Sequence, residues 1–268
     1  SWRWKGCSRY REPMKPKDPH RLSITTYNIH KGFSQFNRRM MVHELRERLR
    51  QLDSDIVFLQ EVQGLHLRHA DNHDNWPEDP QHEFLAEDVW HATAYGKNVI
   101  YDHGHHGNAI LSRHPIIDTH NQDVTHLQFE RRGLLHAQIR LPDGRAAHCV
   151  CVHLSLFGRS RIRQMTALAD YLERIAPDGT PLIIAGDFND WRNRADRELT
   201  DRLGLTEVFG GAAGRPARSF PAALPVFRLD RIYVRSFGVE RAEVHFGAPW
   251  SQISDHAALS AHLLIDVA

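Results

Sequence analysis

Short, continuous apolar runs that end in polar residues are the most regular feature of the chain. Residues 182–185 form such a run, too short for a helix and rich in β-branched side chains, which predicts a strand buried on both faces. Gly186 follows, and then Asp187 and Asn189 stand two positions apart. Because side chains alternate along a strand, both are expected to point the same way at its carboxyl end. Ligands bind beyond that end in open α/β sheets, although an Asx-type turn that merely closes a strand explains the pattern equally well.

Further apolar runs and amphipathic stretches alternate along the chain. Strands are predicted at residues 22–28, 55–61, 92–101, 107–111, 134–141, 146–153, 227–235, 239–246 and 257–265. Helices are predicted at residues 37–52, with Asn37 as the cap, and at 82–89, 160–175 and 195–203. A polar stretch at 64–80 is expected to be a long loop, and Pro142 to Arg145 a hairpin turn. This order predicts an α/β (α+β) protein with two mixed β-sheets packed face to face and helices outside.

Composition and charge narrow the choice of protein class. The 268-residue chain has 41% hydrophobic and 25% charged residues and a formal net charge of +1, and no apolar run approaches the roughly 18 residues of a membrane helix. A near-neutral charge argues against non-specific nucleic-acid binding through bulk charge but leaves a local basic patch open. Three cysteines are too few for a disulfide framework, so we expect a reducing, cytoplasmic location.

One folded domain preceded by a short basic segment is the predicted organisation. Residues 1–21 combine several Lys and Arg residues with aromatic residues and prolines. They lack the apolar core of a secretory signal, so we interpret them as a basic N-terminal extension. Such a segment could touch phosphates or a membrane surface, but a partly ordered extension is the commoner structure. No linker-like Gly/Ser tract divides residues 22–268, which we expect to form a single catalytic domain.

Polar residues of the types that bind metals or transfer protons stand at the ends of several predicted strands. They are Asn28, Glu61, His153, Asp187, Asn189, Asp230, Asp255 and His256. Packing alone does not explain so many carboxylates, amides and imidazoles at strand ends. Glu61 is the strongest candidate for a metal ligand, because a carboxylate at the end of a buried strand is costly without a cation. The alternative is a surface acid paired with a lysine or arginine.

These polar strand ends belong to a series of short motifs. The motifs are Tyr27-Asn28, Leu59-Gln60-Glu61-Val62, Gly107-Asn-Ala-Ile-Leu-Ser-Arg-His-Pro115, Val152-His153-Leu154, Gly186-Asp-Phe-Asn189, Leu229-Asp230-Arg-Ile-Tyr233 and Ser254-Asp255-His256. Their order and spacing, over residues 22–265, resemble the endonuclease/exonuclease/phosphatase superfamily of DNase I-like phosphohydrolases. The resemblance implies a four-layer α/β sandwich and hydrolysis of a phosphoester that depends on Mg²⁺ or Mn²⁺.

The resemblance also implies roles for the metal and for the attacking water. Glu61, Asn28 and Asp255 would form the metal site, in which Asn28 would orient Asp187 or a metal-bound water and Asp255 would bind the metal directly or through a neighbouring group. Mg²⁺ prefers such oxygen ligands. Asp187 would orient or deprotonate the attacking water. Asn189 would donate an amide hydrogen bond to a phosphate oxygen.

Two histidines complete the implied catalytic set. His256, with its other ring nitrogen held by Asp230, would act as general base or as a stabiliser of phosphate. The choice of base between Asp187 and His256 stays open. His153 would stabilise charge on the transferring phosphoryl group or assist the leaving oxygen.

A further set of residues is predicted to bind the substrate. These are His30, Lys31, Asn108, Trp191, Arg192 and Phe220. His30 departs from the pattern of abasic-site nucleases, which place an acidic residue there, so that activity is not simply transferred to this chain. Lys31 could meet a phosphate. Trp191 and Phe220 could stack a base, pack an acyl or sugar group, or merely cover the core.

The predicted function is a phosphodiesterase or nuclease. Arginines at positions 159, 161, 163, 192 and 194 favour DNA or RNA as partner, and the near-neutral net charge argues against broad DNA binding. The enzymatic alternative is a phosphodiesterase or phosphatase that acts on a phospholipid headgroup or a small phosphoester. A catalytically silent binding protein is disfavoured, because Glu61, Asp187, Asn189 and His256 are all present.

Overall fold

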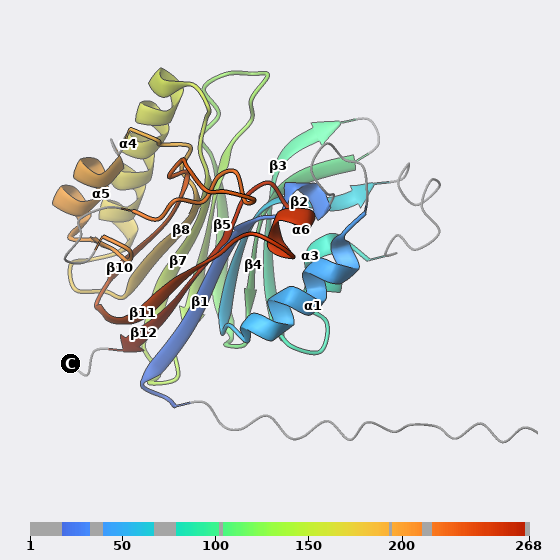
Figure 1. The fold of residues 1–268 in the computed structure, drawn as a ribbon. Coiled ribbons are helices and arrows are strands. Elements are labelled where there is room, and N and C mark those ends of the chain that lie inside the picture. Colours follow the sequence, from blue (N-terminus) through green and yellow to red (C-terminus); the bar gives the residue numbers. More distant parts are fainter. Residues whose placement is uncertain are drawn as a thin grey trace, which may run out of the picture.

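Two six-stranded β-sheets form the centre of the protein, which is described here by a computed structural model covering residues 18–32, 40–66, 79–101, 104–192, 195–210 and 216–265 (Figure 1). The first sheet contains, in spatial order, β11 (Phe237–His245), β12 (Ala258–Ile265), β1 (Arg21–Asn28), β2 (Ile56–His66), β4 (Gly104–Ser112) and β3 (Ala92–Tyr101). The second contains β5 (Ile116–Asp123), β6 (Gly133–Arg140), β7 (Ala146–His153), β8 (Leu182–Asp187), β10 (Asp230–Arg235) and β9 (Thr206–Glu207). Because β1 is parallel to β2 and β7 to β8 while other neighbours are antiparallel, both sheets are mixed.

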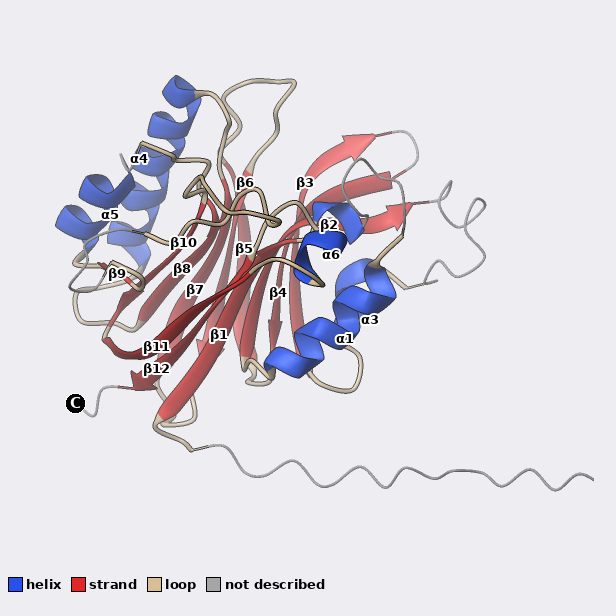
Figure 2. Ribbon diagram, viewed as in Figure 1, coloured by secondary structure: helices blue, strands red, loops and turns tan. Residues whose placement is uncertain are grey.

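Helices cover the outer face of each sheet (Figure 2). Beside the first sheet lie α1 (Val42–Leu52), α3 (Gln81–Ala86), α6 (Trp250–Ile253) and the short 3₁₀ helix η1 (His30–Gly32). Beside the second lie α4 (Gly158–Ile175) and α5 (Ala195–Leu203). One buried apolar cluster lies between the sheets and one lies under each helical layer. The predicted four-layer sandwich is therefore confirmed.

The apolar patterns explain where each element packs. β8 is buried along its whole length, as its unbroken apolar run predicts for a strand covered on both faces. Met165, Leu168 and Leu172 form the buried stripe of α4 and pack on the second sheet. The strand–helix–strand connections β1–α1–β2 and β7–α4–β8 bring two pairs of parallel strands together, so the carboxyl ends within each pair lie side by side.

Several predicted boundaries differ from the structure. β5 had no counterpart in the sequence prediction, because this edge strand is almost wholly exposed and carries no apolar alternation. β2 continues to His66 into the predicted loop, of which residues 67–78 lie outside the described residues. α1 begins at Val42 with Met41 at its N-cap, and the predicted cap Asn37 lies outside the described residues. β10 begins at Asp230 rather than at 227, since Phe227 forms only an isolated bridge with Phe220.

The structure bears on three further features of the sequence: the cysteines, the basic N-terminal extension and the question of a membrane helix. Cys149 and Cys151 alternate along β7, and both are free and buried. Most of the basic extension, residues 1–17, lies outside the described residues. Among the residues that the structure describes, no helix is long and apolar enough to cross a membrane.

Candidate active site

Strands from both sheets deliver polar side chains to one end of the sandwich. In the first sheet Asn28 ends β1, and Glu61 lies on the neighbouring strand β2 just past the residue that pairs with Asn28. In the second sheet His153 ends β7 and is the register partner of Asp187, the last residue of β8. Asp187 in turn pairs with Asp230, the first residue of the antiparallel strand β10. The topology therefore gathers residues that are far apart in sequence.

Unusual backbone conformations are concentrated at this end of the sheets. In the described part of the chain, seven residues other than glycine have positive φ, and four of them, His30, Lys31, Glu61 and Asn189, surround the site. Glu61, with φ of 56°, lies where the pairing of β2 with β4 shifts register between Leu59 and Val62. Such conformations cost free energy and persist where the surrounding structure imposes them, which occurs frequently at functional sites.

Asn28 links the two sheets at the site. Its Nδ2 lies 3.3 Å from Glu61 Oε1 and 3.2 Å from Asp187 Oδ2, so one amide donor serves a carboxylate from each sheet. Its Oδ1 accepts a hydrogen bond from the backbone N–H of His30 at 3.1 Å. The backbone carbonyl of Asn28 accepts the Ser254 hydroxyl at 2.7 Å. The side-chain atoms of Asn28 are thus engaged with protein groups, and its role toward a metal or a water stays a prediction.

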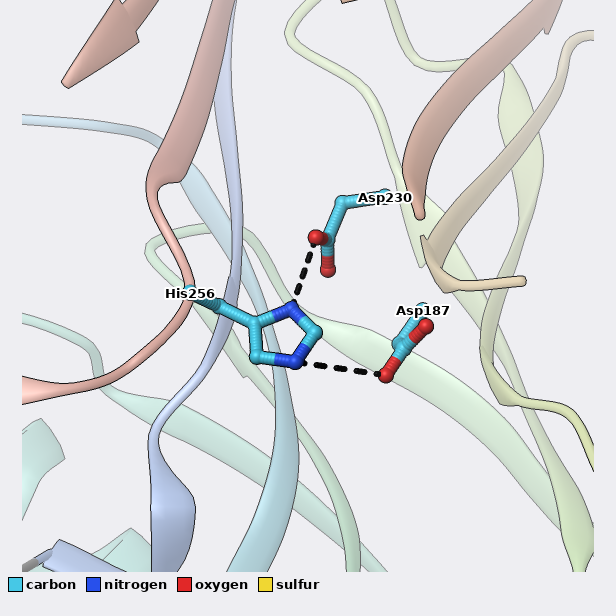
Figure 3. Close-up of side chains that lie close together, drawn as sticks. All are labelled: Asp187, Asp230 and His256. Atoms are coloured by element: carbon cyan, nitrogen blue, oxygen red, sulfur yellow. Dashed lines mark hydrogen bonds and ion pairs between the residues drawn. The ribbon is translucent and has the colours of Figure 1, made fainter. Parts of the chain in front are cut away.

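His256 lies between two carboxylates (Figure 3). Its Nδ1 is 2.8 Å from Asp230 Oδ2, and its Nε2 is 3.8 Å from Asp187 Oδ2. Asp230 is itself fixed, because its backbone N–H donates to the Ser219 hydroxyl at 3.1 Å. The Asp230 carboxylate therefore sets the orientation of the imidazole, whose Nε2 faces Asp187.

Burial and neighbouring charge shift the protonation of these groups. Burial alone would lower the pKa of the His256 imidazole, but the carboxylates of Asp230 and Asp187 outweigh it and raise this pKa above its ordinary value. Burial, reinforced by the Asp230 charge, raises the pKa of the Asp187 carboxyl, and the nearby imidazole partly offsets the rise. The pKa of the His153 imidazole falls well below its ordinary value because burial disfavours the charged ring.

His153 and Asn189 flank Asp187. The Nε2 atom of His153 lies 3.5 Å from Asp187 Oδ2. The backbone N–H of Asn189 donates to Asp187 Oδ1 at 2.9 Å, and its side-chain Nδ2 donates to the carbonyl of Leu154 at 2.9 Å. Asp187 is thus held by partners on both oxygens while it still lines the pocket.

Glu61 and Asp255 offer oxygen donors for a divalent cation. They lie on either side of His30, whose Nδ1 is 4.0 Å from Glu61 Oε2 and 3.7 Å from Asp255 Oδ1. Neither carboxylate has a lysine or arginine partner in the described part of the chain, which removes the interpretation of Glu61 as an ordinary surface ion pair. Two partly exposed carboxylates that share a pocket without such a partner fit a hard cation such as Mg²⁺.

A second group of metal donors lies deeper. Asp187, Asp230 and His256 place one donor atom each within 4.8 Å of one another and could hold a metal. However, the hydrogen bond to Asp230 engages His256 Nδ1, and Mg²⁺ favours oxygen over imidazole nitrogen. The donor chemistry therefore favours the Glu61 and Asp255 side for Mg²⁺.

A pocket of about 590 Å³ joins these residues. Glu61, His153, Asp187, Asn189, Asp255 and His256 all line it. Of the predicted substrate-binding residues, Lys31, Trp191 and Phe220 also line it, and the ring of Phe220 lies 5.1 Å from that of His256. The volume is typical of sites for small molecules or for one segment of a larger ligand.

Three predicted substrate-binding residues, His30, Asn108 and Arg192, lie outside the lining of this pocket. Asn108 is fully buried on β4, and its Nδ2 lies 3.1 Å from the carbonyl of Gly133 and 3.3 Å from that of Cys151. It ties the first sheet to the second, so its position does not support contact with substrate. Arg192 is exposed and borders a smaller hollow beside Trp191.

Comparison with known proteins shows the family. The family model described as "Endonuclease/Exonuclease/phosphatase family" matches residues 25–256. The chain belongs to the endonuclease/exonuclease/phosphatase family. The matched span runs from β1 to His256 and contains every residue of the site described above. Members of this family are phosphoester hydrolases, which agrees with the resemblance found in the sequence motifs.

Curated relatives and solved structures are similar to this protein over most of the chain. The Escherichia coli (strain K12) protein named "Uncharacterized protein YbhP" is 46% identical over 243 residues, which is 90% of this chain and 96% of that one. The mannosyl-6-phosphatase Bt3783 of Bacteroides thetaiotaomicron superimposes with a TM-score of 0.68 at 17% identity, covering 91% of this chain and 99% of that one. The structure of D. rerio TDP2 complexed with single-strand DNA product superimposes with a TM-score of 0.64 at 20% identity. The match covers 91% of this chain and 98% of that one. At these identities the two structures show the shared fold.

The structure adds pocket residues that sequence reasoning passed over. Arg132, just before β6, and His106, on β4, line the pocket beside Lys31. Burial, helped by the charge of Lys31, lowers the pKa of His106 to about 4. Leu156 and Phe227 add apolar lining. No family motif covers Arg132, Leu156 or Phe227, and His106 stood among many histidines in the sequence, so no signal separated these residues from ordinary surface positions.

Proposed function

We propose that the protein is a divalent-metal-dependent phosphodiesterase that uses Mg²⁺ or Mn²⁺. The observation that carries the proposal is the convergence of Glu61, Asp187 and His256, from three separate parts of the chain, on one pocket. Family membership supports a phosphoester as substrate. The apolar wall that includes Trp191 and Phe220 supports a diester, because it can accommodate the second ester group.

Glu61 and Asp255 would hold the cation, with Asn28 fixing Glu61 through its amide. A divalent cation held there would supply charge neutralisation for the phosphate and for the leaving oxygen. His30 lies between the two carboxylates, at distances longer than a hydrogen bond. Lys31, on the same turn, adds a positive charge to the pocket.

Asp187 would activate the attacking water. Its Oδ1 is held by the N–H of Asn189 and its Oδ2 by Asn28, so the carboxylate is fixed in position. As the water oxygen forms its bond to phosphorus, Asp187 takes the proton, and the bond to the leaving oxygen breaks. His256 Nε2 and His153 Nε2, both beside Asp187 Oδ2, donate hydrogen bonds to the phosphoryl oxygens on which charge develops. The leaving oxygen takes a proton from solvent.

Hydrolysis of bis-p-nitrophenyl phosphate tests this function. We expect turnover in Mg²⁺ or Mn²⁺ and its loss in EDTA. Glu61→Gln should lose most of this activity because it removes a carboxylate from the cation site. Glu47→Gln, an exposed carboxylate on α1, is the matched control and should match the wild type. Equal rates for Glu61→Gln and the wild type, or no metal-dependent turnover, would remove the proposal.

Whether the substrate is DNA or RNA, a phospholipid headgroup or a small phosphoester stays a prediction. A nuclease should nick plasmid DNA, and its activity should fall steeply as salt rises. A phosphatase should prefer p-nitrophenyl phosphate to the diester. The predicted cytoplasmic location also stays a prediction.

A further inference from the structure

Exposed apolar side chains gather around the mouth of the pocket. Thirteen large hydrophobic side chains are exposed among the residues that the structure describes, and eight of these belong to segments 124–132, 154–163, 190–192 and 218–229. Each of these segments contributes at least one residue to the pocket lining. We call the eight side chains the apolar rim: Phe129, Leu156, Phe157, Ile162, Trp191, Leu224, Val226 and Phe227.

Side chains of the apolar rim from more than one of the four segments line the pocket. The rings of Phe129 and Phe157 meet edge to face at 5.8 Å, and Leu156, next to Phe157, lines the pocket. Trp191 and Phe227 line it as well. In Figure 1 the light-green loop after β5 and the orange loop before β10 lie at the same end of the sheets as the N-terminal end of α4. The apolar rim therefore borders the entrance.

The charges between the rim residues are positive. The same four segments carry exposed arginines at positions 131, 159, 163, 192 and 218. They contain two acidic residues, and neither is exposed. Glu130 accepts hydrogen bonds from Arg132 and from the backbone N–H of Leu156, each at 3.1 Å, and Asp190 is fully buried. These four segments thus combine apolar side chains with positive charge that no exposed acidic residue within them offsets, although the whole chain is nearly neutral.

This combination matches one kind of ligand surface. A large exposed apolar patch around a polar site marks an interaction surface, because leaving it in water is unfavourable. Nucleic-acid bases would stack on Trp191 and Phe227, but they give no role to the aliphatic Leu224 and Val226. An anionic lipid surface accounts for both features, since apolar side chains enter the boundary between headgroups and acyl chains while arginines meet lipid phosphates.

We propose that the apolar rim and its arginines dock the protein on an anionic phospholipid surface. Docking in this orientation places the pocket entrance at the level of the headgroups, where the phosphodiester of a phospholipid lies. The choice of that phosphodiester as substrate rests on the proposed function, whereas the docking itself does not require catalysis.

Co-sedimentation of the full chain with vesicles in EDTA tests the docking. We expect binding to vesicles of phosphatidylcholine mixed with an equal amount of phosphatidylglycerol, weaker binding at high salt, and little binding to phosphatidylcholine alone. The double change Leu224→Ser and Val226→Ser should lower the partition coefficient about tenfold, because two aliphatic side chains no longer enter the membrane. Both positions are exposed, so the fold should tolerate the changes.

Matched controls separate the rim from apolar exposure in general. Ile117 on β5 and Val239 on β11 are exposed but belong to none of the four segments. Ile117→Ser with Val239→Ser should bind vesicles as the wild type does. Absence of binding to anionic vesicles, equal loss in both double variants, or tight binding to a single-stranded oligonucleotide in place of vesicles would overturn the proposal.

An activity measurement distinguishes this inference from the proposed function. With Mg²⁺ present, Leu224→Ser with Val226→Ser should lower the rate on phosphatidylglycerol in vesicles relative to the rate on bis-p-nitrophenyl phosphate. Hydrolysis of the soluble diester without vesicle binding would leave the proposed function in place and reject the docking. Vesicle binding without hydrolysis of either ester would reject the proposed function and leave the docking in place.

Discussion

Asp187 is held by neighbours that come from several different strands. Asn28 reaches it from β1, His153 from β7 and His256 from the loop just before β12, while Asn189 follows two residues later in the chain. Each of these side chains is at least nine-tenths buried, so their positions are fixed by packing and hydrogen bonds. Pre-organisation of this kind lets a carboxylate and an imidazole act on a bound phosphate without rearrangement.

At the residue scale, Asp230 is a positioning residue, and its removal should release the His256 imidazole from its fixed orientation. Asp230→Asn weakens the bond at Nδ1, so the imidazole loses its fixed orientation and its raised pKa. We expect kcat on bis-p-nitrophenyl phosphate to fall roughly 10²-fold or more with a small change in KM, and NMR titration to show a lower His256 pKa. Asp170→Asn, an exposed acid on α4, is the matched control. An unchanged kcat together with an unchanged titration would contradict this role.

At the element scale, the parallel pairing of β7 with β8 places His153 beside Asp187. Gly186 lets the two strands approach closely, because a Cβ at this position would lie 2.0 Å from the carbonyl oxygen of Val152. Its φ of +148° is also a conformation that residues other than glycine rarely adopt. The glycine before Asp187 is therefore part of the geometry of the site.

Gly186→Ala should destabilise the fold strongly. We expect a loss of roughly 3 kcal/mol or more in the free energy of unfolding, measured by urea denaturation, because backbone atoms must separate. Gly144→Ala in the β6–β7 turn is the control. It has φ of +88° but no atom within 4 Å of the added Cβ, so only backbone strain of roughly 1–2 kcal/mol is expected. Equal losses in the two variants would show that close approach does not matter at Gly186.

The sequence predicted elements whose apolar pattern was unbroken and missed those without one. β8 and the buried face of α4 follow directly from their hydrophobic periodicity. β5 is exposed along nearly its whole length, so nothing in its sequence distinguishes it from a loop. At the site, motif residues such as Glu61 were predictable, whereas Arg132 reaches the pocket only through the path of the loop before β6, which no local pattern encodes.

At the scale of the whole molecule, the polar side chains inside the layers make stability depend on pH. His136 on β6 lies under α4, with its Nδ1 2.9 Å from the Tyr171 hydroxyl and its Nε2 3.0 Å from His148 Nδ1. Burial, helped by the neighbouring His148, lowers the pKa of His136 to about 4. The His136 ring is therefore neutral in the folded protein above about pH 4.

Unfolding should become easier as the pH falls from about 6.5 to about 4. The unfolded chain binds a proton at His136 near its ordinary pKa of 6.5, whereas the folded chain binds it only near 4, so stability is lost across that window. His136→Gln should flatten the dependence of melting temperature on pH, and His91→Gln, an exposed histidine, should leave it unchanged. A His136→Gln profile as steep as that of the wild type would contradict this explanation.

In the proposed mechanism Glu61 and Asp255 hold the cation, and Asp187 acts on the water. It is tested most directly by Mn²⁺ titration of bis-p-nitrophenyl phosphate hydrolysis for the wild type, Glu61→Gln and Asp187→Asn. We expect that Glu61→Gln needs much more Mn²⁺ for half-maximal rate, while Asp187→Asn has a kcat lower by roughly 10²–10⁴-fold even at saturating Mn²⁺. Full activity of the wild type in EDTA, or an Asp187→Asn enzyme with wild-type kcat, would contradict it.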